Sequence, residues 1–267
     1  MYVLPYERRK KIMSKLVWDK DFINKVICGD CLSIMPQIPD KSIDMILCDL
    51  PYGTTACKWD TIIPFEPLWK QYKRIIKDNG AIVLTASQPF TSALVMSNIK
   101  MFKYELLWLK EQGNQPQLCN IQPMKAHENI LIFGNGKLTY NPQFTEGKPY
   151  SDNRKSKKGL VVNNIKHLGK TKFSGTVKNN VIKRFPLSFR QINCERTGLH
   201  PTQKPVVLFE YLIKTYTNEG DLVLDNCAGS GTTGVACKKT GRNYILIEKE
   251  EKYCKIAQER LRQEILL

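Results

Sequence analysis

A turn at positions 49–53 carries side chains well suited to chemistry. The apolar run Asp44–Cys48 leads into Asp49–Gly53, which reads DLPYG. Asp, Pro and Gly are also ordinary turn residues, so this turn by itself fits a plain strand end equally well. A carboxylate beside a rigid proline and an aromatic ring can also accept hydrogen bonds from an amino group and stack on a flat ring. That combination would suit a nucleobase that carries an exocyclic amine and lies outside a duplex.

A glycine-rich loop near the C-terminus is the second candidate site. Residues 222–234 read LVLDNCAGSGTTG, an apolar run followed by the spacing G-x-G-x-x-G. Glycine lets a backbone approach a ligand closely, and the start of a helix offers free N–H groups. This spacing discriminates weakly between nucleotide ligands, and the missing lysine excludes a P-loop. Asp225 suits the cationic end of a ligand better than a pyrophosphate, and Glu248 could accept ribose hydroxyls.

The elements that must position these two sites alternate along the chain, which predicts an α/β fold with a doubly wound, mostly parallel sheet. The expected strands are Lys25–Cys28, Asp44–Cys48, Ala81–Thr85, Tyr104–Leu109, Asn129–Phe133, Leu222–Leu224 and Asn243–Ile247. The expected helices are Phe65–Lys77, Phe90–Ser97, Lys204–Thr217, Thr232–Thr240 and Glu250–Leu266. Because little chain follows Glu248, the remaining strands must come from upstream, and the order is a circular permutation of the usual one.

An excess of positive charge favours a polyanionic partner. Lys and Arg number 41 against 25 Asp and Glu, a net charge of +16, and nucleic acid is the usual partner of such proteins. Residues 137–195 hold +10 of this excess. Asn, Gly and Pro interrupt the periodicity there, but spaced aromatic residues indicate a partly folded insert rather than a disordered loop. We expect this insert to contact DNA phosphates through Arg154, Lys155, Lys157 and Lys158.

The nine cysteines indicate a reduced, cytoplasmic protein rather than a disulfide-linked one. Their number is odd, and several lie in apolar runs where cysteine acts as a small hydrophobic residue. Cys28 and Cys31 form a C-x-x-C pair without a second pair at zinc spacing, so no metal site is expected. No apolar run approaches the roughly 18 residues of a membrane span, and no secretory signal is recognised at the N-terminus.

Together, the turn and the loop resemble those of the S-adenosylmethionine-dependent DNA amino-methyltransferases. Asp49–Tyr52 is similar to the catalytic motif of that family, commonly Asp-Pro-Pro-Tyr, with Leu50 replacing a proline. Asp225–Gly231 resembles the family's cofactor loop, and the order of motifs is that of its permuted beta class. The resemblance covers about 25–135 and 196–262, and its further matching segments are Ile27–Leu32, 39–53, 127–133 and 200–205.

The resemblance implies a Rossmann-like methyltransferase domain that a target-recognition insert interrupts. Residues 1–136 would form the catalytic half, 137–195 the insert and 196–267 the cofactor-binding half. Asp49 and the Leu50 carbonyl would accept hydrogen bonds from the target amine, Pro51 would stiffen the turn, and Tyr52 would stack on the flipped base. S-adenosylmethionine would be held by Asp30, Cys31, Asp225, Gly229, Ser230, Gly231, Thr232 and Glu248, with Lys204 near it.

The leading interpretation is methylation of adenine N6 in double-stranded DNA. Methylation of cytosine N4 needs the same geometry, although such enzymes more often have Ser at the position of Asp49. Methylation of RNA and DNA binding without catalysis are further alternatives. Carbon-5 cytosine methylation is disfavoured because the chain has no Pro-Cys, and a nicotinamide oxidoreductase because no hydride-transfer site is recognised. No membrane partner is expected, whereas a partner restriction nuclease and a monomeric or homodimeric state stay open.

Overall fold

An eight-stranded sheet forms the centre of the molecule in the computed structural model. The structure describes residues 17–55, 57, 60–114, 116–152, 161–162, 171–172, 178–195 and 203–263. The strand order is β1-β12-β11-β2-β3-β5-β4-β10. Their bounds are β1 Lys25–Cys28, β2 Ile43–Asp49, β3 Ile76–Ala86, β4 Phe102–Asn114, β5 Lys125–Gly134, β10 Phe189–Gln191, β11 Leu222–Asp225 and β12 Asn243–Glu248. Within this sheet, β5 pairs antiparallel with both of its neighbours, and the other pairings are parallel.

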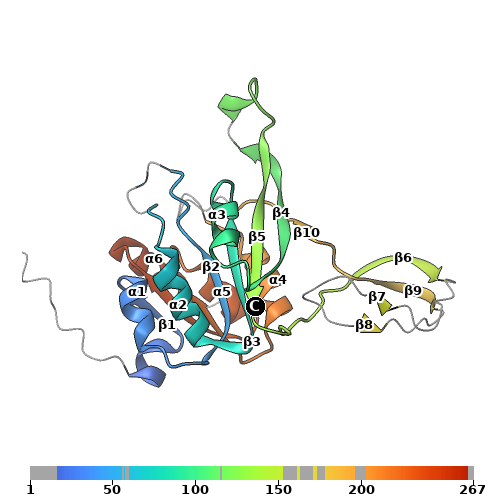
Figure 1. Cartoon of the computed structure of the whole chain (residues 1–267). Coiled ribbons are helices and arrows are strands. Elements are labelled where there is room, and N and C mark those ends of the chain that lie inside the picture. Colours follow the sequence, from blue (N-terminus) through green and yellow to red (C-terminus); the bar gives the residue numbers. More distant parts are fainter. Residues whose placement is uncertain are drawn as a thin grey trace, which may run out of the picture.

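Helices cover both faces of this sheet (Figure 1), which confirms the doubly wound α/β fold. The α-helices are α1 Cys31–Ile34, α2 Phe65–Ile75, α3 Phe90–Ser97, α4 Val206–Tyr216, α5 Thr232–Lys239 and α6 Glu251–Arg262. Three short helical turns are η2 Trp18–Phe22, η3 Met35–Gln37 and η4 Pro116–Leu118. One buried cluster packs α1, α2 and α3 against the sheet, and a second packs α4 and α5 against its other face. No described helix has both the length and the apolar composition of a bilayer span.

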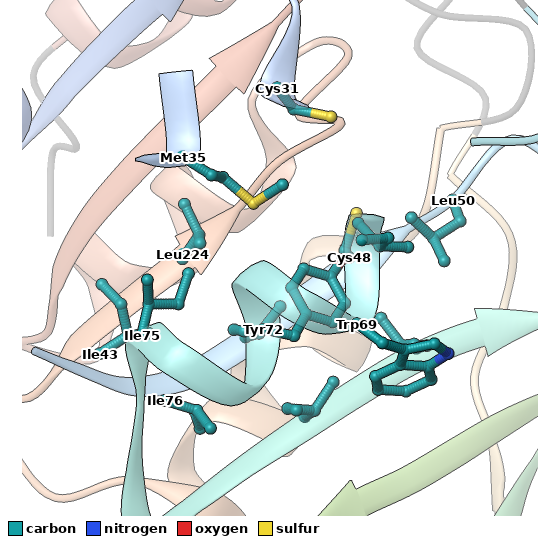
Figure 2. Close-up of a cluster of buried hydrophobic side chains, with 14 of the residues drawn as sticks. Cys31, Met35, Ile43, Cys48, Leu50, Trp69, Tyr72, Ile75, Ile76 and Leu224 are labelled. Carbon is teal, nitrogen blue, oxygen red and sulfur yellow. The ribbon is translucent and has the colours of Figure 1, made fainter. Parts of the chain in front are cut away.

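The amphipathic helix α2 shows how the sequence builds one of these faces. Its buried side chains are Leu68, Trp69, Tyr72 and Ile75, a spacing that places them along one stripe of a helix. Figure 2 shows three of them packed among residues of the sheet. The Tyr72 hydroxyl also donates to Asn226 Oδ1 at 2.5 Å. This bond ties α2 to the chain just after β11, at the edge of the sheet that carries the candidate site.

The permuted order predicted from the sequence is present in the sheet. The N-terminal strand β1 pairs with the C-terminal strand β12, and β2 pairs with β11. The four carboxyl ends therefore meet at one edge, where ligands bind in open α/β sheets. Asp49 and Asp225 are the last residues of β2 and β11, and Glu248 is the last residue of β12.

Three strands, β3, β4 and β5, extend well beyond their predicted bounds for identifiable reasons. β3 begins at Ile76, within the helix expected at Phe65–Lys77, because Ile76 pairs with Ile43 of β2. β4 continues past Leu109 to Asn114, which pairs with Lys125 of β5. This longer β4–β5 hairpin projects beyond the rest of the sheet (Figure 1). It therefore adds side chains to the edge at which the other strands end.

The segment 137–195 contains both separate ribbons and a strand of the main sheet. β6 Thr145–Asp152 pairs with β9 Lys178–Arg184, and β7 Val161–Val162 pairs with β8 Thr171–Lys172. These ribbons lie to one side of the main sheet (Figure 1). The short edge strand β10 was not predicted; its Arg190 lies opposite Trp108 of β4. The four basic residues expected to contact phosphates, Arg154, Lys155, Lys157 and Lys158, lie outside the described residues.

Candidate active site

Asp49 ends β2 with a carboxylate that accepts hydrogen bonds from three side chains. The Tyr52 hydroxyl donates to Oδ1 at 2.7 Å, and the Thr85 hydroxyl donates to the same oxygen. Thr85 lies opposite Asp49 in the β2–β3 pairing, so the strand register delivers its hydroxyl. Lys204 Nζ donates to Oδ2 at 2.5 Å. The carboxylate is thus fixed in orientation, while 23% of its side chain stays exposed.

Tyr52 both offers an aromatic face and orients Asp49. Its ring stacks on Phe90 of α3, with ring centres 5.2 Å apart and planes inclined by 25°. Phe90 covers one face of the ring, so a flat ligand must use the other face. Burial and the neighbouring charge of Asp49 raise the pKa of Tyr52. The hydroxyl therefore stays protonated and can donate to the Asp49 carboxylate.

The loop after the turn is held by Asp60. Its Oδ1 accepts from the Gly53 amide at 2.8 Å, and its Oδ2 accepts from the amides of Thr54 at 2.9 Å and Thr55 at 2.7 Å. Burial acts to raise the pKa of Asp60, but these donors outweigh it and the pKa is lowered. Asp60 and Thr85 were not predicted, because neither belongs to a recognisable motif. Their roles follow from loop closure and strand pairing.

A chain of alternating charges connects Asp49 to the β4–β5 hairpin. Lys204 Nζ lies 3.4 Å from Glu128 Oε2, and Lys110 Nζ lies 2.5 Å from Glu128 Oε1. Burial alone would raise the pKa of Glu128, but Lys204 and Lys110 lower it. Burial would lower the pKa of Lys204, but the charges of Asp49 and Glu128 raise it. Glu128 and Lys204 are therefore held in their charged forms. Lys204, expected near the cofactor, is paired with Asp49 instead.

The glycine loop holds Glu248 by backbone groups. The Gly229 amide donates to Glu248 Oε2 at 2.7 Å, and the Glu250 amide donates to Oε1 at 2.8 Å. Gly229 has a φ of +52°, a conformation that favours glycine. Gly231, with φ +80°, precedes α5, and a Cβ there would lie 2.9 Å from the Cβ of Ala257. Gly231 therefore permits close packing of α5 and α6.

Asp225 is buried below this loop, and its carboxyl group accepts hydrogen bonds from the loop and from the first turn of α5. The Cys227 amide donates to Oδ1 at 3.0 Å, and the Thr233 hydroxyl donates to Oδ2. Burial raises the pKa of Asp225 to about 7, although Thr233 and Cys227 oppose that shift. The carboxyl group therefore changes protonation near neutral pH, and a nearby cation would favour its charged form.

Asp30 and Cys31 follow β1 at the same edge. Asp30 Oδ2 accepts from the Ser33 amide and hydroxyl, both at 3.0 Å, which caps α1. Cys31 is 6% exposed. A hydrogen bond from the Cys227 thiol lowers the pKa of Cys31. The nine cysteines are free thiols, and among the described residues no three His, Cys, Asp or Glu side chains are grouped to hold a metal ion.

A cavity of about 580 Å³ brings these groups together at the carboxyl edge of the sheet. This volume is typical of a small-molecule site. The expected site residues that line it are Asp30, Cys31, Asp49, Leu50, Pro51, Tyr52, Lys204, Asp225, Gly229, Ser230, Thr232 and Glu248. Gly231 does not line it. The hairpin adds Trp108, Lys110, Asn114 and Glu128, none of which was predicted as a site residue. Lys110 and Asn114 lie past the end of the expected strand Tyr104–Leu109, and Glu128 lies before the start of the expected strand Asn129–Phe133. Trp108 lies within an expected strand, and its sequence position alone does not mark it as a site residue.

Known proteins match most of the length of this chain. A family model for N6/N4 methyltransferases, described as DNA methylase, matches residues 43–259. The type II methyltransferase M.HinfI of Haemophilus influenzae is 29% identical over 91% of this chain and 69% of that protein. The type II methyltransferase M1.MboII of Moraxella bovis is 28% identical over 86% of this chain and 94% of that protein.

Solved structures share the fold. The complex of M1.HpyAVI with SAM superposes with a TM-score of 0.58, at 24% identity, over 89% of this chain and 99% of that one. The cytosine-N4-specific PvuII DNA methyltransferase superposes with a TM-score of 0.61, at 17% identity, over 91% of this chain and 87% of that one. The resemblance found in the sequence is confirmed: this chain belongs to the N6/N4 DNA methylase family.

Proposed function

We propose that this protein transfers a methyl group from S-adenosylmethionine to the N6 amine of an adenine flipped out of double-stranded DNA. The observation that carries this proposal is the convergence of Asp49 and Glu248 on one cavity. They end β2 and β12, which flank β11. Two strand spacings of about 4.8 Å separate these ends by roughly 10 Å. A nucleoside-containing cofactor and a base can therefore lie next to each other.

The cofactor half of the cavity fits a nucleoside that carries a cationic amino-acid end. Each oxygen of Glu248 accepts one backbone hydrogen bond and so keeps a second acceptor position for a ribose hydroxyl. The Asp30 carboxylate is the acceptor proposed for the adenine amino group, beside the backbone of Cys31. Asp225 lies below the loop, where an ammonium group would stabilise its charged form. When bound, S-adenosylmethionine supplies an electrophilic methyl group on its sulfonium.

The other half of the cavity is suited to an exocyclic amine. The lone pair of an adenine amine is delocalised into the ring, which makes it a weak nucleophile. The Asp49 carboxylate and the Leu50 carbonyl would accept its two N–H groups and stabilise the positive charge that develops on nitrogen. The face of Tyr52 opposite Phe90 would stack on the base, a contact worth about 1–3 kcal/mol. No covalent attachment to the protein is needed.

Adenine and duplex DNA are the substrate choices that the residues favour. Asp49 stands where cytosine-N4 enzymes of the resembling family more often have Ser. The net charge of +16 favours a polyanion, and we assign phosphate contacts to the insert, including Arg154, Lys155, Lys157 and Lys158. The relatives are named as type II methyltransferases, which supports a role in restriction-modification beside a partner nuclease.

The direct test is transfer of labelled methyl from S-adenosylmethionine to DNA in a single turnover, followed by nucleoside analysis. We expect N6-methyladenine, and sequencing of DNA from a host that expresses the protein would define the target site. Detection of N4-methylcytosine instead would show that cytosine, and not adenine, is the target base. Methyl transfer to RNA but not to duplex DNA would show that the substrate is RNA. Cofactor binding without transfer to either would contradict the proposed enzyme activity.

A further inference from the structure

The amine-binding position at Asp49 already holds a cation. Lys204 Nζ lies 2.5 Å from Asp49 Oδ2, and its side chain is only 7% exposed. The other carboxylate oxygen, Oδ1, accepts from both Tyr52 and Thr85. The same ammonium lies 5.7 Å from the centre of the Tyr52 ring. Lys204 thus occupies the acceptor, and lies close to the aromatic ring, that the proposed function assigns to the target base.

An ammonium in this position opposes methyl transfer to a neighbouring amine. The amine nitrogen becomes positively charged as it attacks, and a second cation on the same carboxylate oxygen would repel it. Lys204 must therefore leave Asp49 Oδ2 before the reaction, but a buried ammonium needs another partner. Among the described residues, an acceptor lies within a short side-chain movement of Lys204.

That acceptor is Glu128. Its Oε1 is bound by Lys110 at 2.5 Å, which fixes the carboxylate on β5. Its Oε2 lies 3.4 Å from Lys204 Nζ. Among the residues that the structure describes, this buried oxygen accepts no hydrogen bond. A buried acceptor without a bond is unfavourable, and a small movement of Lys204 would satisfy it.

We propose that Lys204 occupies the position of the target amine in the free enzyme and moves to Glu128 when the base enters. This inference rests on the proposed function, and it holds for an adenine or a cytosine amine. Glu128 is then a positioning residue, since it acts through Lys204 and not on the substrate. The exchange keeps Asp49 paired at all times: first with the ammonium, then with the amine.

The charges predict an unusual order of activity among variants of the full chain. Glu128→Gln removes the receiving anion, so Lys204 stays on Asp49, and single-turnover transfer at saturating DNA should slow by about tenfold or more. Lys204→Met frees Asp49 and should be less impaired than Glu128→Gln. The double variant reproduces the electrostatics of the exchanged state, with a free Asp49 beside a neutral pair, and should recover to within about threefold of the wild-type rate.

The measurements are the single-turnover rate, the Kd for duplex DNA and the Kd for S-adenosylmethionine. Both Kd values should stay within about threefold of wild type, because phosphate contacts and Glu248 are unchanged. Lys41→Met, which breaks an exposed ion pair with Asp78, is the matched control for losing a lysine. Recovery in the double variant supports the exchange. A double variant as slow as Glu128→Gln, or slower, would overturn it.

The two proposals fail in distinguishable ways. Wild-type protein that transfers no methyl group to DNA contradicts the proposed function. Active wild-type protein with an inactive Lys204→Met variant, still folded and still binding the cofactor, contradicts the exchange alone. In that case Lys204 would instead be required on Asp49 during the reaction. Thermal melting of each variant separates these outcomes from a loss of folding.

Discussion

The two halves of the cavity are constructed differently. On the cofactor side, Glu248 and Asp225 accept hydrogen bonds from the loop 227–233 and from Glu250, which is two residues away from Glu248. On the amine side, Asp49 is held by Thr85 and Lys204, which lie 36 and 155 residues away, as well as by Tyr52. The cofactor side is organised within one continuous stretch, residues 225–250, whereas the amine side is organised by residues spread from 49 to 204.

Because of this difference, the two sides of the cavity should be sensitive to different substitutions. Backbone amides keep their positions when a side chain changes, so the cofactor side should respond to substitutions of its own two carboxylates. The amine side depends on neutral and charged donors from several elements, so substitutions far away in sequence should affect it. Asp49 should therefore be sensitive to partners that no linear motif contains.

The largest expected effect is on the amine side. Asp49→Ala removes the acceptor that orients the target amine, and loss of one such preorganised group typically costs about 100- to 1000-fold in turnover. Cofactor affinity should hardly change, because Glu248 and Asp225 lie on other strands. Single-turnover transfer and calorimetry with S-adenosylmethionine measure the two quantities. Equal losses of transfer rate and cofactor affinity would show that the two sides of the cavity do not act independently.

The next effect is on the cofactor side. Glu248→Gln places an amide NH₂ group against either the Gly229 or the Glu250 N–H, both of which are donors. Losing a hydrogen bond to a charged group costs about 1.5–3 kcal/mol, so cofactor affinity should fall by roughly 10- to 100-fold. The rate at saturating cofactor should fall much less. An unchanged Kd would remove Glu248 from the cofactor site.

A smaller effect is expected from the partners of Asp49. Tyr52→Phe keeps the ring that stacks on Phe90 but removes one of two hydroxyl donors to Oδ1. Thr85→Val removes the other. Each should slow single-turnover transfer by about tenfold, while Thr85→Ser, which keeps the hydroxyl, should stay near wild type. Full activity of both Tyr52→Phe and Thr85→Val would show that Asp49 needs no fixed orientation.

The last prediction concerns stability rather than activity, through the pH dependence of Asp225. Its pKa of about 7 in the folded protein exceeds the ordinary 3.8, so the folded state binds more protons between these values. The free energy of unfolding should therefore fall as the pH rises through this window. Asp225→Asn removes the titration, and its Tm relative to wild type should rise between pH 4 and pH 8 by several degrees. The exposed Asp78→Asn serves as control; a pH-independent difference for Asp225→Asn would contradict the shift.

The sequence predicted the parts of the site whose geometry is local. The apolar runs ending at Asp49, Asp225 and Glu248 correspond to β2, β11 and β12, because buried parallel strands read as continuous apolar segments. The glycine loop was also predicted correctly, because its backbone conformation depends on residues within the loop. Asp49, Asp225, Glu248 and most residues of the glycine loop line the same cavity.

The missed parts depend on register and on long-range packing. Glu128 reaches the site only because β5 runs antiparallel and starts where the other strands end. Thr85 is an ordinary strand residue until it is placed opposite Asp49. Lys204 was expected near the cofactor from its segment, but only the packing of the chain before α4 places it on Asp49.

The permuted sheet has a consequence for how the chain folds. Lys25 pairs with Ile245, and Met45 pairs with Val223, so the pairings of β1 with β12 and of β2 with β11 cannot form until most of the polypeptide has been synthesised. Such non-local pairing makes folding slow. Until β11 arrives, the apolar strand β2 presents an open edge to which other strands can add. Nascent or truncated chains should therefore aggregate more readily than the complete protein and depend more strongly on chaperones.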